Sequence, residues 1–108
     1  KNGTGKTASF LIPLIQKVDL KINHIQSLVI VPTRELAIQT CNACAELSQF
    51  TAVKSCALTG GTKKTDDIAH VKKVHILVTT TGRIHDFSCR NLIDLSHVSI
   101  ICIDEVFK

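Results

Sequence analysis

The chain has 108 residues, a formal net charge of +4 and 44% hydrophobic residues. This length is enough for one domain or part of one, and the apolar content excludes intrinsic disorder. The mild positive charge suits an anionic partner but does not by itself identify one. All apolar runs are shorter than the roughly 20 residues that cross a bilayer, so we expect no membrane partner. The five cysteines are scattered and odd in number, which favours free thiols in a reducing, intracellular setting.

The predicted elements alternate between helix and strand. Apolar spacing predicts a first helix from Gly5 or Lys6 to about Lys17, and two more over roughly Arg34–Gln49 and near Lys64–Lys73. Four β-branched runs are continuously apolar, which is typical of strands buried on both faces. These runs are Ser27–Val31, Val53–Leu58, Val74–Thr79 and Val98–Ile103. Strands that alternate with helices pair in parallel, so we expect an α/β fold with a parallel sheet of about four strands and helices on both faces.

The first residues contain a pattern typical of a phosphate-binding loop. Gly3 and Gly5 let backbone N–H groups point inward at a helix start, and Lys6 suits the β- and γ-phosphates of a nucleotide. The hydroxyl of Thr7 suits Mg²⁺. The first glycine of the full pattern would precede Lys1, so the match is partial. A Gly-Lys-Thr triplet is also compatible with a plain turn.

An acidic pair, Asp104 and Glu105, follows the last predicted strand. Ligands of open parallel sheets lie outside the carboxyl ends of the strands, so we expect this pair at the same edge as the phosphate loop. An aspartate there can hold Mg²⁺, and the glutamate can polarise an attacking water. A solvated acidic turn is the alternative for the pair alone. The glycine-rich loop and the acidic pair together favour a P-loop NTPase.

Three segments between these motifs also follow predicted strands: Pro32–Ala37, Thr59–Thr62 and Thr80–Arg83. They offer hydroxyls, backbone N–H groups and arginines, which hold a sugar–phosphate backbone without reading the bases. Each has a structural alternative, since Thr33 could cap a helix, Gly60-Gly61 could form a tight turn and Gly82 could relax a loop. Their order and placement favour RNA contact, whereas a P-loop kinase leaves them without a role.

Together the motifs resemble the first RecA-like domain of the DEAD-box ATP-dependent RNA helicases. The matching segments are Gly3–Thr7, Pro32–Ala37, Gly60-Gly61, Thr80–Arg83 and Asp104-Glu105. Several stretches, among them Ile25–Thr40, are especially similar to the cytoplasmic subgroup that represses translation and promotes mRNA decapping in processing bodies. The resemblance covers essentially the whole chain and implies an enzyme that hydrolyses ATP, with ATP and Mg²⁺ as cofactors.

The resemblance also implies a role for each matching residue. Glu105 would act on the attacking water and Lys6 on the phosphates, so both would be catalytic. Thr7 and Asp104 would hold Mg²⁺. The residues around ATP would be Asn2, Gly3, Thr4, Gly5, Lys6 and Thr7. Those that bind single-stranded RNA or mRNA would be Pro32, Thr33, Arg34, Gly60, Gly61, Thr80, Thr81, Gly82 and Arg83.

Two motifs depart from the family pattern. Val106 and Phe107 stand where the family has alanine and aspartate, and that aspartate helps to couple ATP hydrolysis to RNA. A phenyl ring cannot form the charged hydrogen bonds of a carboxylate, so the alternative function is a non-catalytic RNA-binding scaffold. Thr81 stands where the family has proline, which leaves the loop less restricted but adds an N–H group.

The resemblance predicts that residues 1–108 are a partial helicase ATP-binding domain, truncated at both ends. A first residue other than methionine fits an internal segment of a longer chain. The second RecA-like domain would supply an arginine finger and half of the RNA clamp, so we expect residues 1–108 alone to be inactive or very weak. Decapping or translational-repression factors are expected as further partners.

The cysteine and histidine residues suggest no site by their spacing. Cys41 and Cys44 share a helix face without a second ligand pair, and we interpret them as core residues rather than a zinc half-site. The five histidines have no common spacing, and we expect them at the surface or at element edges.

Overall fold

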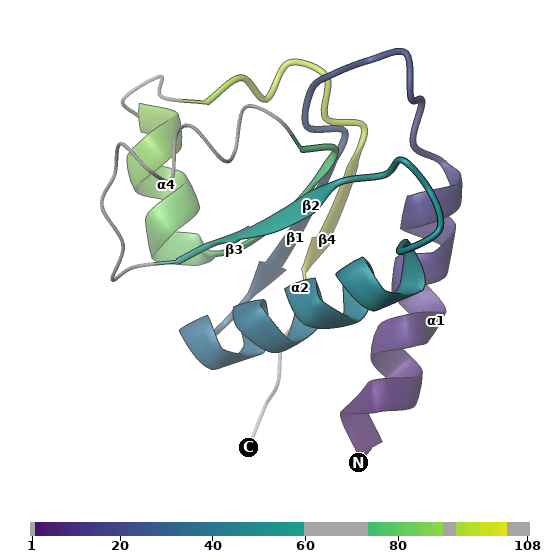
Figure 1. Ribbon diagram of the computed structural model, residues 1–108. Helices are drawn as coiled ribbons and strands as arrows, with labels where there is room; N and C mark the ends of the chain where they lie inside the picture. The colour runs from purple at the N-terminus through teal and green to yellow at the C-terminus, as the bar shows by residue number, and fades with distance from the viewer. Residues whose placement is uncertain (1, 60–73, 90–92, 104–108) are drawn as a thin grey trace.

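The computed structural model describes residues 2–59, 74–89 and 93–103, with the backbone alone for residues 2–8 and 86–89. The helices are α1 (Asn2–Gln16), α2 (Arg34–Leu47) and α4 (Thr81–Cys89). The strands are β1 (Ser27–Val31), β2 (Ser55–Leu58), β3 (Ile76–Thr80) and β4 (Ile100–Ile103). The strands form one parallel sheet in the order β2-β3-β1-β4 (Figure 1). The predicted parallel α/β sheet of four strands is confirmed, and the helix predicted near Lys64–Lys73 lies outside the described residues.

The two central strands carry the core. Alternate residues of a strand point to opposite faces, so β1 and β3 contribute to two separate apolar clusters. On one face, Val29 and Val78 pack with α1 and α2 through residues such as Leu11 and Cys44. On the other face, Leu28 and Leu77 pack with Leu58 of β2 and with Val74. Ile84 of α4 joins the same cluster. Helices therefore cover both faces, as predicted (Figure 1).

The prediction that all four strands are buried on both faces is wrong for β4. Ile100 and Cys102 pack against the cluster under α1 and α2, whereas Ile101 and Ile103 are 60% and 61% exposed. The strand order explains this difference, because β4 pairs with β1 along one side of the described sheet. Helix α4 contacts β3, at a distance from β4, and so it leaves the outer face of β4 open (Figure 1).

One predicted helix start and one predicted loop also differ from the structure. Helix α1 begins at Asn2, so the expected glycine loop before Lys6 is helical in its backbone. Adding residues to an existing helix costs little compared with starting one, which allows α1 to extend through Gly3 and Gly5 despite their low helix propensity. The loop expected over Thr80–Arg83 is also absent, because β3 passes directly from Thr80 into α4.

His75 lies directly before β3, at an element edge as expected, and it is buried there. Its backbone N–H donates to the Lys54 carbonyl over 2.8 Å, and its own carbonyl accepts from the Gln26 N–H over 2.7 Å. Its Nδ1 accepts from the Lys54 N–H over 3.0 Å. These bonds join the segments that enter β2, β3 and β1. Burial, with a smaller effect of the Lys54 charge, lowers the pKa of His75.

This lowered pKa predicts an acid-sensitive fold. Since the unfolded imidazole has a pKa near 6.5, the unfolded chain binds the proton first as the pH falls. The free energy of unfolding should therefore be steady above about pH 7 and decrease as the pH drops below about 6.5. Urea unfolding at about pH 7.5 and pH 5.5 measures the decrease.

The His75→Asn variant keeps a hydrogen-bond acceptor but cannot take up a proton, so its decrease should be smaller than that of the wild type. His85→Asn, at an exposed position of α4, is the control and should follow the wild type. Equal decreases in all three proteins would rule out His75 as the sensitive group.

Candidate functional site

Two of the segments predicted to contact RNA leave the sheet side by side. In the parallel pairing of β1 with β3, Val31 lies opposite Thr80, the last residue of each strand. Pro32 and Thr81 follow directly, so both segments begin at the carboxyl edge of the sheet. Strand β4 ends at the same edge, because Ile30 lies opposite Ile103. The expectation that these segments share one edge is confirmed for the described residues.

Thr33, the second residue of the first segment (Pro32–Ala37), caps α2. Its backbone is extended (φ −132°, ψ 157°), and its Oγ1 accepts from the Leu36 N–H over 3.1 Å. Its carbonyl accepts the Ala37 N–H over 3.0 Å. Glu35 adds negative charge to the first turn, where it stabilises the helix dipole. The structural alternative for Thr33 is therefore confirmed, and the same cap fixes where Pro32 and Arg34 lie, both of them exposed.

The second segment, Thr80–Arg83, runs from the last residue of β3 into the first turn of α4. Thr81 and Gly82 are exposed and Arg83 is half-buried. A methyl group added to Gly82 would meet no atom within 4 Å. The fold therefore has no steric need for glycine here, and glycine in a helix costs about 1 kcal/mol relative to alanine. The alternative in which Gly82 relaxes a loop does not hold, and the bare backbone remains open to close approach by a ligand.

Thr79 holds the end of β3 in place. Its side chain is fully buried, and its Oγ1 donates to the Leu58 carbonyl of β2 over 2.8 Å. This bond joins the carboxyl ends of β2 and β3. It therefore sets the position of Thr80, which is half-buried at the start of the second segment.

Three helices begin at this edge. Helices α2 and α4 start within three residues of the ends of β1 and β3. The N-terminal end of α1 lies on the same side as the tips of the strands (Figure 1). The first N–H groups of a helix have no acceptor within the helix, and the helix dipole makes this end positive. With Arg34 and Arg83 close to two of these starts, the edge is suited to phosphate groups.

The remaining predicted site residues are untested by the geometry. Asn2, Gly3, Thr4, Gly5, Lys6 and Thr7 lie in the first turns of α1, where the backbone alone is described. Gly60, Gly61, Asp104 and Glu105 lie outside the described residues, as do Val106 and Phe107. The catalytic, nucleotide-binding and metal-binding roles therefore stay predictions.

The core interpretation of Cys41 and Cys44 is confirmed. Cys44 is fully buried in the cluster under α1 and α2, and Cys41 packs against that cluster. Burial raises the pKa of both thiols. A hydrogen bond with the Ser55 side chain lowers the pKa and so offsets part of this increase. Both cysteines are free thiols, and so is Cys102.

Comparison with known families decides between the candidate classes. Residues 1–106 match the family described as DEAD/DEAH box helicase. This chain belongs to that family. The resemblance derived from the motifs is therefore confirmed, and a P-loop kinase is excluded.

Curated relatives of this DEAD-box chain are named as ATP-dependent RNA helicases. The probable ATP-dependent RNA helicase ddx6 of Dictyostelium discoideum is 50% identical over 100% of this chain and 26% of its own length. The ATP-dependent RNA helicase DHH1 of Yarrowia lipolytica is 47% identical over 100% of this chain and 21% of its own length. The chain thus spans 21–26% of the length of these two relatives.

Solved structures confirm the fold as that of a DEAD-box helicase domain. A DEAD box protein from the hyperthermophile Methanococcus jannaschii is 39% identical with a TM-score of 0.88, over 94% of this chain and 28% of that chain. S. cerevisiae Dbp5, bound to RNA and ADP BeF3, is 26% identical with a TM-score of 0.82, over 92% of this chain and 25% of that chain.

No helix among the described residues is both long and apolar enough to cross a membrane.

The cap on α2 predicts a measurable stability effect. Thr33→Ala removes the acceptor of the Leu36 N–H and should lower the free energy of unfolding by about 1 kcal/mol. Thr33→Ser keeps the acceptor and should stay within about 0.5 kcal/mol of the wild type. Urea unfolding followed by circular dichroism measures both variants. An alanine variant as stable as the serine variant would show that the Thr33 hydroxyl does not stabilise α2.

Proposed function

We propose that this chain is part of the first RecA-like domain of an ATP-dependent RNA helicase. The pairing of Val31 with Thr80 is the observation that carries the proposal, because it sets both described RNA segments at one edge, beside three helix starts. The family match across residues 1–106 supports it. Hydrolysis and unwinding or remodelling of RNA–protein complexes would belong to the longer protein, which would contain a second RecA-like domain.

The nucleotide would bind at the start of α1. The ammonium group of Lys6 and the free backbone N–H groups in the first turn of α1 would hold the phosphates, with Asn2–Thr7 around them. Thr7 and Asp104 would hold Mg²⁺, and Glu105 would orient the attacking water. Bound Mg²⁺ with ATP supplies the activated phosphoryl group of the reaction. The placement of the α1 start on the side of the strand tips supports this assignment (Figure 1).

Single-stranded RNA would cross the same edge over α2 and α4. The Arg34 guanidinium would pair with a phosphate, and backbone N–H groups at the starts of α2 and α4 would hold others. Gly82 would let the RNA backbone approach closely. Gly60 and Gly61 are assigned to this surface by the family resemblance. None of these groups distinguishes one base from another, so binding would be independent of sequence.

The partners and cellular setting follow from the subgroup resemblance. We assign the parent protein to the cytoplasm, including processing bodies, with mRNA as substrate and decapping or translational-repression factors as partners. The relatives DHH1 and ddx6 are ATP-dependent RNA helicases by name, which supports the RNA substrate. The departure at Val106 and Phe107 favours one alternative, an RNA-binding scaffold in which ATP hydrolysis is uncoupled.

Arg34 provides the test of the RNA surface. In the 108-residue chain, Arg34→Ala should weaken binding of a fluorescent oligouridylate by about tenfold, because it removes a charge-assisted phosphate contact. It should also reduce the dependence of the affinity on salt. Fluorescence anisotropy at two salt concentrations measures both effects.

Lys21→Ala is the matched control. It removes the same charge from an exposed residue before β1, at the opposite edge of the sheet. This variant should bind RNA as the wild type does. If Lys21→Ala weakens binding as much as Arg34→Ala, RNA is attracted by net charge alone and the proposed surface is wrong.

A further inference from the structure

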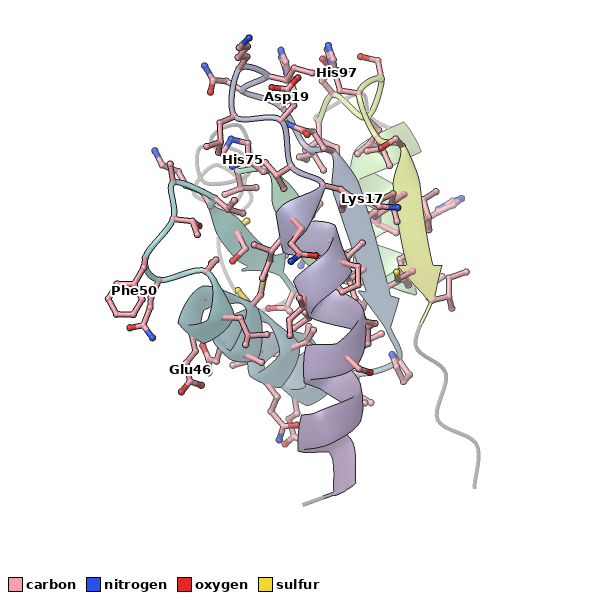
Figure 2. All side chains as sticks on the ribbon, turned by 90° about the vertical axis from the view of Figure 1, so that its right-hand side faces the viewer. Lys17, Asp19, Glu46, Phe50, His75 and His97 are labelled. Carbon is pink, nitrogen blue, oxygen red and sulfur yellow. The ribbon has the colours of Figure 1, made fainter. Side chains whose placement is uncertain are left out.

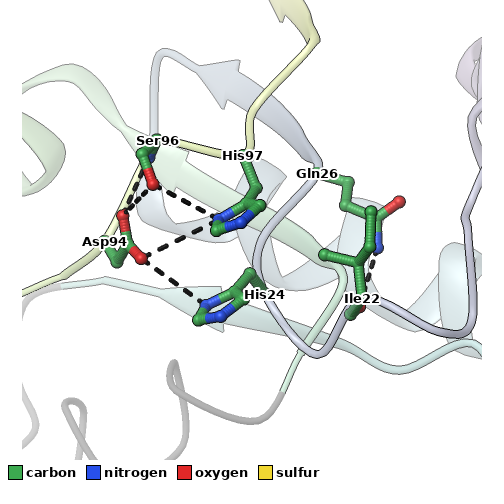
Figure 3. Close-up of polar contacts among 6 residues, drawn as sticks. All are labelled: Ile22, His24, Gln26, Asp94, Ser96 and His97. Atoms are coloured by element: carbon green, nitrogen blue, oxygen red, sulfur yellow. Dashed lines mark hydrogen bonds and ion pairs between the residues drawn. The ribbon is translucent and has the colours of Figure 1, made fainter.

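Two histidines and an aspartate meet at the amino edge of the sheet, away from the proposed RNA surface. His24 precedes β1, and Asp94 and His97 precede β4. Nδ1 of His24 lies 3.6 Å and Nδ1 of His97 lies 3.8 Å from Oδ2 of Asp94 (Figure 3). One ligand atom from each of the three lies within 4.8 Å of the others. We call these three residues the His–Asp cluster.

The sheet register explains why the two histidines meet. Ser27 of β1 lies opposite Ile100 of β4, and each histidine lies three positions before one of these residues. The Ser99 N–H donates to the Gln26 carbonyl over 3.0 Å, so the alignment continues beyond the strands. The two imidazole rings are stacked, with centroids 4.2 Å apart and planes inclined by 3°. Figure 2 shows His97 at the same end of the molecule as Asp19 and His75.

Ser96 orients the carboxylate of Asp94. Its N–H and its Oγ both donate to Oδ1 of Asp94, over 2.9 Å and 2.6 Å. Oδ2 is then the oxygen that faces both imidazoles (Figure 3). The two bonds from Ser96 hold the Asp94 carboxylate in one orientation, and an aspartate with an ordinary pKa near 3.9 is ionised at neutral pH. A fixed and ionised carboxylate is what a metal ligand requires, and partners that orient a ligand raise metal affinity.

The segment that carries His24 is held by the buried side chain of Gln26. Its Nε2 donates to the carbonyls of Asp19 and Ile22, each over 2.9 Å, and its Oε1 accepts from the Asp19 N–H over 2.8 Å. The backbone around His24 is therefore fixed before any ligand binds. A fixed backbone lowers the entropic cost of bringing ligands together.

The geometry points to a Zn²⁺ site formed by Nδ1 of His24, Nδ1 of His97 and Oδ2 of Asp94, with water completing the tetrahedron. Zinc bonds of about 2.1 Å at tetrahedral angles separate ligand atoms by about 3.4 Å. The two observed nitrogen–oxygen distances are only slightly longer. Two imidazoles and one carboxylate form a donor set that zinc accepts and that Mg²⁺, which prefers oxygen, does not. The ion would clip the segment before β1 to the segment before β4.

Binding needs the two rings to leave their stack. Each Nδ1 lone pair lies in the plane of its ring, and parallel planes do not meet at one ion. The side chains of His24 and His97 are 46% and 41% exposed, which leaves room for the rings to turn. The test should therefore detect a change at these two rings when zinc binds.

Thiols are the natural competitors for zinc in this chain. Burial raises the pKa of Cys41, Cys44 and Cys102, which disfavours the thiolate that zinc needs. The nitrogen and oxygen atoms of the His–Asp cluster are exposed and need no thiolate. A readout that detects thiolate ligation is still required, and Co²⁺ provides one because thiolate ligation adds strong charge-transfer absorption.

Calorimetric titration of ZnCl₂ into the full chain at about pH 7.5, in a non-chelating buffer with phosphine reductant, tests the site. The wild type should bind one Zn²⁺, and His97→Ala should bind it at least about tenfold more weakly. Histidine ring resonances of His24 and His97 should shift on binding. Co²⁺ bound to the wild type should show no thiolate absorption.

Three further variants make the result decisive. Asp94→Asn keeps an acceptor for Ser96 but loses the charge, so it should weaken zinc binding. This variant tests the site independently if His97→Ala fails to fold. His85→Ala, an exposed histidine on α4, and Cys41→Ser should bind zinc as the wild type does. The proposal is overturned if the wild type binds no zinc, if Asp94→Asn binds it unchanged, or if Cys41→Ser abolishes binding.

Discussion

The parallel pairing of β1 with β3 is the interaction on which the rest of this structure depends. These two strands lie in the middle of the order β2-β3-β1-β4 and contribute side chains to the apolar clusters on both faces. The clusters bring α1 and α2 to one face and α4 to the other. Without this pairing, the two faces would have no common centre and the helix starts would have no common edge.

Strand β1 organises both ends of the sheet through its pairings with β3 and β4. At the carboxyl end, the pairing of Val31 with Thr80 sets the start of α2 beside the start of α4. At the amino end, the pairing of Ser27 with Ile100 brings His24 to His97. We assign the first edge, where α1, α2 and α4 begin, to the nucleotide and RNA. The second edge carries the His–Asp cluster, which we connect with zinc rather than with RNA.

Much of this fold could be predicted from the sequence because the spacing of apolar residues indicates which faces of helices and strands are buried. Strand β1 was predicted with the bounds that the structure shows, and α2 was predicted to within two residues at its end. Helix α4 was missed because Thr81 and Gly82 are poor helix formers that read as a loop, while the burial of Ile84 under the sheet favours the helix. The exposure of Ile101 was missed because an apolar run does not reveal which strand lies at the side of the sheet.

Contacts between distant residues were beyond prediction from composition and spacing. His24 and His97 show no common spacing in the chain, and only the register of β1 with β4 makes them neighbours. The burial of His75 depends in the same way on Lys54 and Gln26, which come from other elements. By contrast, the shared edge of Pro32–Arg34 and Thr80–Arg83 followed from the general geometry of parallel sheets, and it was predicted correctly.

The central claim is that the carboxyl edge joins a nucleotide to RNA, and RNA-stimulated ATP hydrolysis tests it most directly. The longer protein that would contain this chain should hydrolyse ATP faster when single-stranded RNA is added. Lys6→Ala should remove this stimulation, because Lys6 would hold the phosphates, and Phe107→Asp should increase it by restoring a carboxylate. If the wild type and Lys6→Ala show the same background rate while both still bind RNA, the protein is an RNA-binding scaffold and the claim is contradicted.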